Sequence, residues 1–151
     1  MKPLIVLIIS FLVALLCTRV MTGDWMAAVA GNAAMAVMLL FTAIGHFAYS
    51  KGMVMMMPAF MPIKKALVWL TGFIEIFAAV GLLIPSLREL TSWLLILFFI
   101  LILPVNIQAA IKNVDYQKAT YTGSGLKYLW FRIPLQILFV GWVWYFGIYL
   151  S

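Results

Sequence analysis

Residues 66–84 read ALVWLTGFIEIFAAVGLLI, an apolar run whose single charged residue, Glu75, lies near its middle. About 20 apolar residues are what a transmembrane helix needs to cross the hydrocarbon core of a bilayer. A carboxylate at that depth is costly to hold in lipid, so it usually has a partner or a function. The run therefore predicts a membrane-spanning helix with a polar site at Glu75.

The composition extends this prediction to the whole chain. Of its 151 residues, 67% are hydrophobic and 9% are charged, whereas soluble domains carry about 25% charged residues. We therefore expect one membrane domain over residues 1–151. The basic residues that give the net charge of +6 stand singly beside apolar runs, without a basic stripe or a stacking platform, which excludes nucleic acid as a partner. The lone cysteine, Cys17, excludes thiol oxidoreductase chemistry of the C-x-x-C type.

Five apolar runs predict the helices, at residues 3–18, 26–49, 66–84, 92–111 and 129–150. The last four are long enough to span a membrane and predict a four-helix bundle over residues 26–150. The first run is shorter and is either a retained helix or a signal segment cleaved before about Gly23. The absence of an A-x-A cleavage pattern favours a retained helix. The fold class that follows is an all-α transmembrane bundle of four core helices with a fifth, N-terminal helix.

The basic residues also predict an orientation. If the N-terminus is cytoplasmic, eight of the ten Lys and Arg residues fall inside, and only Arg19 and Arg88 fall outside. Cytoplasmic loops carry this excess of positive charge. We expect a multi-pass protein of the bacterial cytoplasmic (inner) membrane, with its N-terminus inside and its C-terminus outside.

Two connections differ in character. Residues 50–65 are too apolar for an ordinary loop and are expected to lie along the inner interface or re-enter it. Their thioethers also suit Cu(I), a soft ion, although interfacial packing is the simpler interpretation of Met53, Met55, Met56, Met57 and Met61. Haem bound through His46, the single histidine, is a weaker metal hypothesis. Residues 113–127 are polar and predict a plain cytoplasmic loop.

The polar residues of the spanning runs fall on faces that also carry small residues, which are typical of helix–helix contacts. At a rise of about 1.5 Å per residue, Glu75 lies about 14 Å from the inner end of its helix, His46 and Arg132 about 5 Å, and Asn106 about 7 Å. All four can meet in the inner half of one bundle. We expect an Arg132–Glu75 ion pair, direct or through water. His46 and Asn106 would fill the remaining hydrogen-bonding positions, with Gln136 one turn from Arg132.

This cluster has two interpretations. It is either a polar clasp that fixes the register of the helices, or a binding pocket or proton-handling site. An acid, a base and amides suit a polar headgroup or a quinone carbonyl. The proline at position 104 would bend its helix and open room beside Asn106. The spacing selects no ligand.

A series of short motifs in order resembles the DoxX-like family of small bacterial membrane proteins. From about Leu40 to Tyr145 they are Gly45-His46-Phe47, Met57-Pro58, Met61-Pro62, Thr71-Gly72-Phe73-Ile74-Glu75-Ile76, Gly81-Leu82-Leu83-Ile84-Pro85, Pro104-Val105-Asn106-Ile107 and Arg132-Ile133-Pro134-Leu135-Gln136. The resemblance implies a four-helix bundle whose shared polar core is His46, Glu75, Asn106 and Arg132. The apolar segment before the first of these helices, and the valine in Pro104-Val105-Asn106, depart from the family pattern.

The resemblance carries two ideas about function. The family is named for a subunit of a thiosulfate:quinone oxidoreductase, and a distant branch includes a chaperone for receptor assembly. We therefore expect a non-catalytic accessory subunit that binds a quinone-like or lipid-like molecule at the polar cluster and serves a membrane redox complex. The alternative is an assembly factor or scaffold for other membrane proteins, with a purely structural cluster. No residue is assigned as catalytic, and transport is disfavoured because no inverted repeat is visible.

Overall fold

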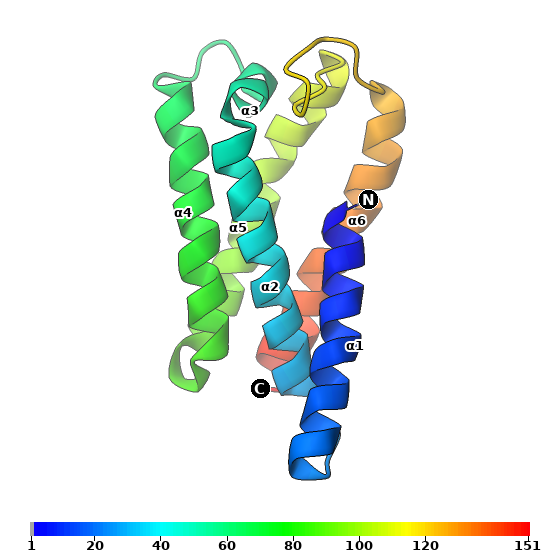
Figure 1. Cartoon of the computed structure of the whole chain (residues 1–151). Coiled ribbons are helices and arrows are strands. Elements are labelled where there is room, and N and C mark those ends of the chain that lie inside the picture. The colour runs from blue at the N-terminus through cyan, green and yellow to red at the C-terminus, as the bar shows by residue number, and fades with distance from the viewer. Residues whose placement is uncertain (1) are drawn as a thin grey trace.

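The computed structural model describes residues 2–151 and is a bundle of helices (Figure 1). Its elements, in chain order, are α1 (Lys2–Thr22), α2 (Ala27–Ala48), α3 (Ser50–Met56), α4 (Lys64–Leu83), α5 (Pro85–Ile111), α6 (Leu126–Trp144) and the π-helix η1 (Tyr145–Tyr149), which continues α6. Within the described residues, five helices are long and apolar enough to cross a membrane: α1, α2, α4, α5 and α6 with η1. The predicted all-α bundle with a fifth, N-terminal helix is confirmed.

Four of these helices enclose the core. Helix α2 packs against α4, α4 against α5, and α5 against α6, while η1 returns to contact α2. Their buried apolar side chains meet in one cluster that includes Met35, Leu39, Leu82, Leu95 and Phe139. The polar groups described below lie between the helices of this ring.

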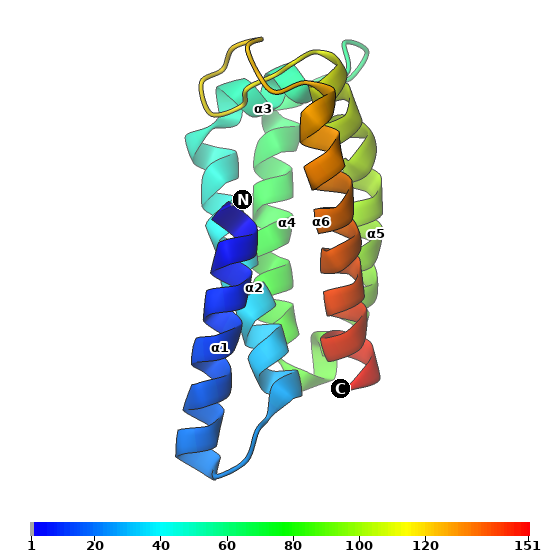
Figure 2. The same cartoon turned by 90° about the vertical axis from the view of Figure 1, so that its right-hand side faces the viewer.

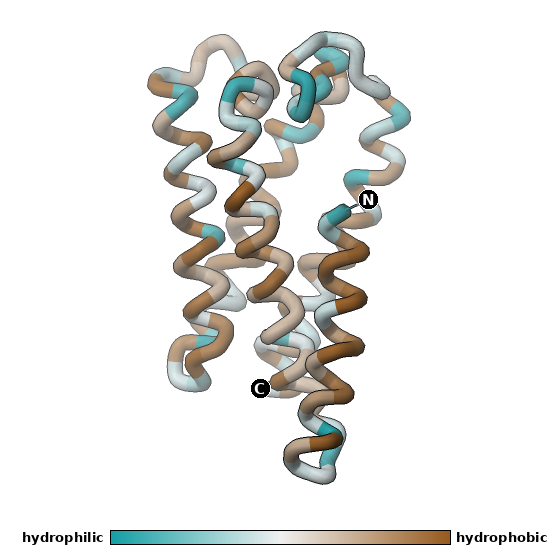
Figure 3. Tube along the Cα trace, viewed as in Figure 1, coloured by the Kyte–Doolittle hydropathy of each residue, from teal (hydrophilic) through white to brown (hydrophobic). Residues whose placement is uncertain are grey.

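Helix α1 lies outside the ring. It packs along α2 and extends past the end of the bundle at which α2 begins (Figure 2). Leu7 is its only buried residue, and Figure 3 shows the helix as hydrophobic over most of its length. Such a surface suits contact with lipid tails or with another apolar helix.

Helix α5 begins earlier than the sequence predicted, at Pro85 rather than Ser92. Proline suits the first turn of a helix because its fixed φ is helical and its missing N–H needs no partner there. Only Ile84 separates α4 from α5, and the Arg88 side chain donates a hydrogen bond from Nε to the Leu82 carbonyl (3.0 Å) at the end of α4. This turn holds α4 and α5 antiparallel.

The connection between α5 and α6 is more ordered than the plain loop that was predicted. Asp115 and Thr120 exchange two backbone hydrogen bonds of 2.8 and 3.2 Å. The Asp115 carboxylate also accepts hydrogen bonds from the next two exposed amides, those of Gln117 and Lys118. This turn packs on α3, where the Tyr116 backbone lies against Gly52 so closely that a side chain there would collide with it.

The methionine-rich segment forms α3 and the extended chain that follows it. Met56 and Met57 are buried, and α3 contacts both α4 and α5. The Lys112 ammonium donates a hydrogen bond to the Met57 carbonyl (3.4 Å). The other thioether residues, Met53, Met55 and Met61, are half-buried. The segment thus packs on α4 and α5.

Candidate functional site

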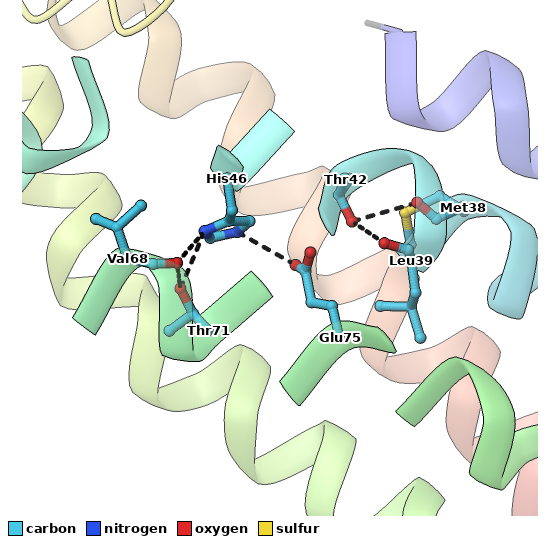
Figure 4. A network of polar contacts seen from close by, with 7 residues as sticks. All are labelled: Met38, Leu39, Thr42, His46, Val68, Thr71 and Glu75. Carbon is cyan, nitrogen blue, oxygen red and sulfur yellow. Dashed lines mark hydrogen bonds and ion pairs between the residues drawn. The ribbon is translucent and has the colours of Figure 1, made fainter. Parts of the chain in front are cut away.

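The centre of the candidate site is a contact between the histidine of α2 and the carboxylate of α4. His46 Nε2 lies 3.5 Å from Glu75 Oε1 (Figure 4), and the Glu75 residue is only 6% exposed. The two helices approach closely here because α4 carries a glycine one turn before the acid. A Cβ at Gly72 would lie 3.0 Å from the Cβ of His46.

The second nitrogen of the imidazole is also held by α4. His46 Nδ1 lies 3.1 Å from the Val68 carbonyl oxygen and 2.9 Å from Thr71 Oγ. The Thr71 hydroxyl donates a hydrogen bond to the same Val68 carbonyl at 2.8 Å. The ring of His46 is therefore fixed through both nitrogens by residues on a single face of α4.

Thr71 is a polar neighbour of the His46–Glu75 contact that the sequence did not reveal. It was named only within a motif, and no partner was assigned to it. Its position one turn before the acid was the available signal, because residues four apart on a helix lie on one face.

One oxygen of the site lacks a partner. Glu75 Oε2 is buried and makes no hydrogen bond to any residue among 2–151. The nearby Thr42 hydroxyl bonds instead to the Met38 and Leu39 carbonyls of its own helix (3.2 and 3.0 Å; Figure 4). A buried carboxylate oxygen without a donor is unfavourable by about 1–3 kcal/mol, so a ligand with a polar group would gain most at this atom.

The predicted Arg132–Glu75 ion pair is wrong. The Arg132 guanidinium lies over the ring of Tyr128, 5.9 Å from its centroid and one turn earlier in α6, while Glu75 pairs with His46. The reason is the order of the helices. Helix α6 packs against α5, and α4 packs against α2 and α5, so a side chain of α2 reaches the acid first. Arg132 is half-buried near the α3 end of the bundle.

The remaining two predicted residues form a separate pair between α5 and α6. Asn106 Nδ2 donates to Gln136 Oε1 at 3.4 Å, and Gln136 Nε2 donates to the Phe99 carbonyl. The carbonyl that Pro104 leaves without its helical donor is that of Ile100, four residues earlier, so the proline does not account for the contact between Gln136 and Phe99. Helix α5 continues through Pro104 as one helix.

A third polar contact lies towards the opposite end of the bundle from α3. The buried Asn32 donates hydrogen bonds to the Ala28 and Phe146 carbonyls (2.8 and 2.7 Å). Nearby, Trp142 Nε1 donates to the Gly31 carbonyl at 3.0 Å. These hydrogen bonds join α2 to α6 and η1. The donors of Asn32 and Trp142 thus find their acceptors within the chain, as expected for a structural contact.

Hollows on the surface lie next to α1. One, of about 270 Å³, lies between α1 and α2 and is lined by Ile9, Ser10, Val13, Ala14, Ala33 and Val37. The other, of about 180 Å³, lies between the start of α1 and the first half of α6. Both are apolar, and neither is lined by residues of the polar contacts. Within residues 2–151 the structure has no group of three His, Cys, Asp or Glu side chains that could hold a metal ion.

The chain was also compared with known proteins. The model of one family, described as a domain of unknown function (DUF8561), matches residues 35–147. The matched range covers most of the chain, includes His46, Glu75, Asn106, Arg132 and Gln136, and leaves out α1. No curated protein and no solved structure matches the chain.

Proposed function

We propose that this chain, which belongs to the DUF8561 family, binds a quinone-like or lipid-like molecule at Glu75 and serves as an accessory subunit of a quinone-linked redox system. The observation that carries this proposal is Glu75 Oε2, a buried carboxylate oxygen without a hydrogen-bond donor inside an apolar bundle. A structural acid would be expected to have both oxygens satisfied, because each unpaired polar atom in hydrocarbon is costly.

The chemistry of the contact fits a polar group that arrives from the membrane. His46 contacts one oxygen of the acid and leaves the other, Oε2, without a hydrogen-bond donor. The redox centre is assigned to a partner protein, since acid, imidazole and amide side chains do not themselves carry electrons. The motif order that resembles the DoxX-like family supports the same quinone-linked role.

The alternative is an assembly factor or scaffold for other membrane proteins, with a purely structural polar core. Two observations favour it. The amides of Asn106, Gln136 and Asn32 all find partners within the chain. In addition, α1 offers a long apolar surface outside the ring, where a helix of another protein would fit. Under this alternative Glu75 has no ligand to hold.

The proposal also includes an orientation in the bacterial cytoplasmic membrane. At the α3 end of the bundle one acid, Asp115, accompanies a set of basic residues: Lys51, Lys64, Lys65, Lys112, Lys118, Lys127 and Arg132. The opposite end carries two basic residues, Arg19 and Arg88, and two acidic residues, Asp24 and Glu89, so its charges balance. This asymmetry supports a cytoplasmic α3 end and a C-terminus outside.

Native mass spectrometry tests the proposed function. Protein released gently from its own membranes should carry one lipophilic molecule of defined mass, and an absorption spectrum should identify a quinone or quinol. We expect Glu75→Gln to lose this molecule while remaining folded. Thr42→Val, which alters only a hydroxyl bonded within its own helix, should retain it. Retention of the molecule by Glu75→Gln, or bulk lipid alone on the unmodified protein, would overturn the proposal.

A further inference from the structure

We infer that His46 and Glu75 hold one proton between them, so that Glu75 Oε2 acts only as a hydrogen-bond acceptor and selects a ligand that presents an O–H donor. The part about the ligand rests on the proposed function. The part about the proton rests on the geometry of the pair alone.

The first step concerns His46 Nδ1. This nitrogen, the Thr71 hydroxyl oxygen and the Val68 carbonyl oxygen lie within 2.8 to 3.1 Å of one another. If Nδ1 carries a proton, that N–H can be shared between the carbonyl oxygen and the hydroxyl oxygen while the hydroxyl donates to the carbonyl, so each of the three contacts includes a donor. If Nδ1 is bare, the single hydroxyl proton serves one contact, and Nδ1 and the Val68 carbonyl oxygen, both acceptors, face each other at 3.1 Å. The contact with the carbonyl oxygen therefore favours a proton on Nδ1.

The second step concerns the other ring nitrogen. A neutral imidazole protonated at Nδ1 has a lone pair at Nε2, and this lone pair would face Glu75 Oε1 at 3.5 Å. Two acceptors turned towards each other in a low-dielectric interior repel strongly. A further proton between Nε2 and Oε1 removes this repulsion. It belongs to a neutral carboxylic acid or to an imidazolium, and both forms give the pair a net charge of zero.

The neutral pair fits its surroundings. The basic side chain expected to balance Glu75, that of Arg132, lies over Tyr128 instead. Within the described residues, the partner of Glu75 in an ion-pair contact is His46. A His46–Glu75 pair that shares a proton has a net charge of zero. Ionisable groups are kept at that depth in hydrocarbon only when their charge is compensated in this way.

The class of ligand follows from the position of the proton. Because it lies on the Oε1 side, Oε2 is a carbonyl or carboxylate oxygen that accepts and does not donate. A quinol hydroxyl or a hydroxylated lipid headgroup offers the matching O–H. A quinone carbonyl and an ionised phosphate offer only acceptors, and they would repel Oε2. The site therefore favours the reduced, hydroxyl-bearing form of a quinone-like ligand over the oxidised form.

The proton can be located without any ligand, because His46 is the single histidine of the chain. Nitrogen NMR of protein labelled with ¹⁵N-histidine reports both ring nitrogens without ambiguity of assignment. We expect a protonated Nδ1 in the full-length protein and in Thr71→Val, in which the Val68 carbonyl still accepts. A bare Nδ1 together with a protonated Nε2 would overturn the shared proton.

Paired probes test the ligand class. Decylubiquinol is compared with decylubiquinone under anaerobic conditions, and dioctanoylglycerol with dioctanoyl phosphatidylcholine, whose phosphodiester has no O–H. We expect at least one hydroxyl donor to bind about tenfold more tightly than its matched acceptor, as for one hydrogen bond to a charged group. Glu75→Gln should remove this preference. The donor that binds identifies the source as a quinol or as a lipid headgroup.

The outcomes separate this inference from the proposed function. Tighter binding of the acceptor probes, with loss in Glu75→Gln, would overturn the donor preference and leave the binding site at Glu75 intact. Binding of neither donor would also overturn the ligand class. If Glu75→Gln retained the native ligand, the ligand would not bind at Glu75, and the proposed function itself would be refuted.

Discussion

At the scale of single residues, Glu75 shows how far a sequence can locate a buried polar site. Depth along the helix and a shared face predicted that this acid lies inside the bundle, and it is buried there. The choice of partner was not predictable in the same way. Periodicity tells which side of a helix faces its neighbours but not which helix the neighbour is. Arg132 and His46 were equally plausible by depth, and packing of α2 on α4 selects His46.

The pairing makes a prediction about stability. His46→Leu should lower the free energy of unfolding by about 1–3 kcal/mol, because Oε1 then joins Oε2 as an unpaired buried atom. The double change His46→Leu with Glu75→Leu should recover most of that loss, since well-packed apolar residues often replace a buried pair without cost. Unfolding in mixed micelles, followed by circular dichroism, measures both. A double variant that is less stable than His46→Leu would refute the pairing.

At the scale of elements, the long helices were predictable and the short pieces between them were not. Hydropathy over many residues locates a spanning helix within a few residues of its ends. The early start of α5 depends on one residue, Pro85. Proline favours the first turn of a helix through its fixed φ, an effect that average hydropathy does not register. The fold of residues 113–125 over α3 depends on contacts between segments far apart in the chain, which no local pattern contains.

The contact between this turn and α3 can be tested through one glycine. Gly52→Ala should displace the turn, because the new methyl group would occupy the position of the Tyr116 backbone. We expect faster proteolysis within residues 113–125, with little change in the unfolding of the spanning helices. Limited proteolysis with mass spectrometry measures this effect.

Gly141→Ala is the matched control, because a Cβ at that position meets nothing within 4 Å. It should leave the proteolysis of the turn unchanged. Equal cleavage of Gly52→Ala and the unmodified protein would show that α3 and the turn do not depend on this contact.

At the scale of the whole molecule, the ring of α2, α4, α5 and α6 divides the predicted cluster. His46, Glu75, Asn106 and Arg132 were expected to meet in the inner half of the bundle. Instead His46 and Glu75 lie between α2 and α4, Asn106 pairs with Gln136 between α5 and α6, and Arg132 lies over Tyr128. The number of helices followed from hydropathy. Their order around the ring did not, because it is set by packing among side chains of similar character.

The proposed orientation makes a prediction for the two ends of the bundle. In a Cys17→Ser background, Ser124→Cys and Ser151→Cys place matched thiols on exposed serines, one in the turn at the α3 end and one at the C-terminus. A membrane-impermeant maleimide applied to intact cells, after removal of any outer membrane, should label the C-terminal thiol and spare the other. Labelling of Ser124→Cys without labelling of Ser151→Cys would show the opposite topology, with the α3 end outside.

The most direct test of a ligand at Glu75 is thermal unfolding of delipidated protein, with and without an extract of the lipids and quinones of its own membrane. A ligand that binds the folded state raises the Tm. We predict that the extract raises the Tm of the unmodified protein more than that of Glu75→Gln, and that the two differ little without it. Equal shifts in both proteins, with Glu75→Gln already less stable in the absence of extract, would contradict the ligand site and make the polar pair a structural clasp.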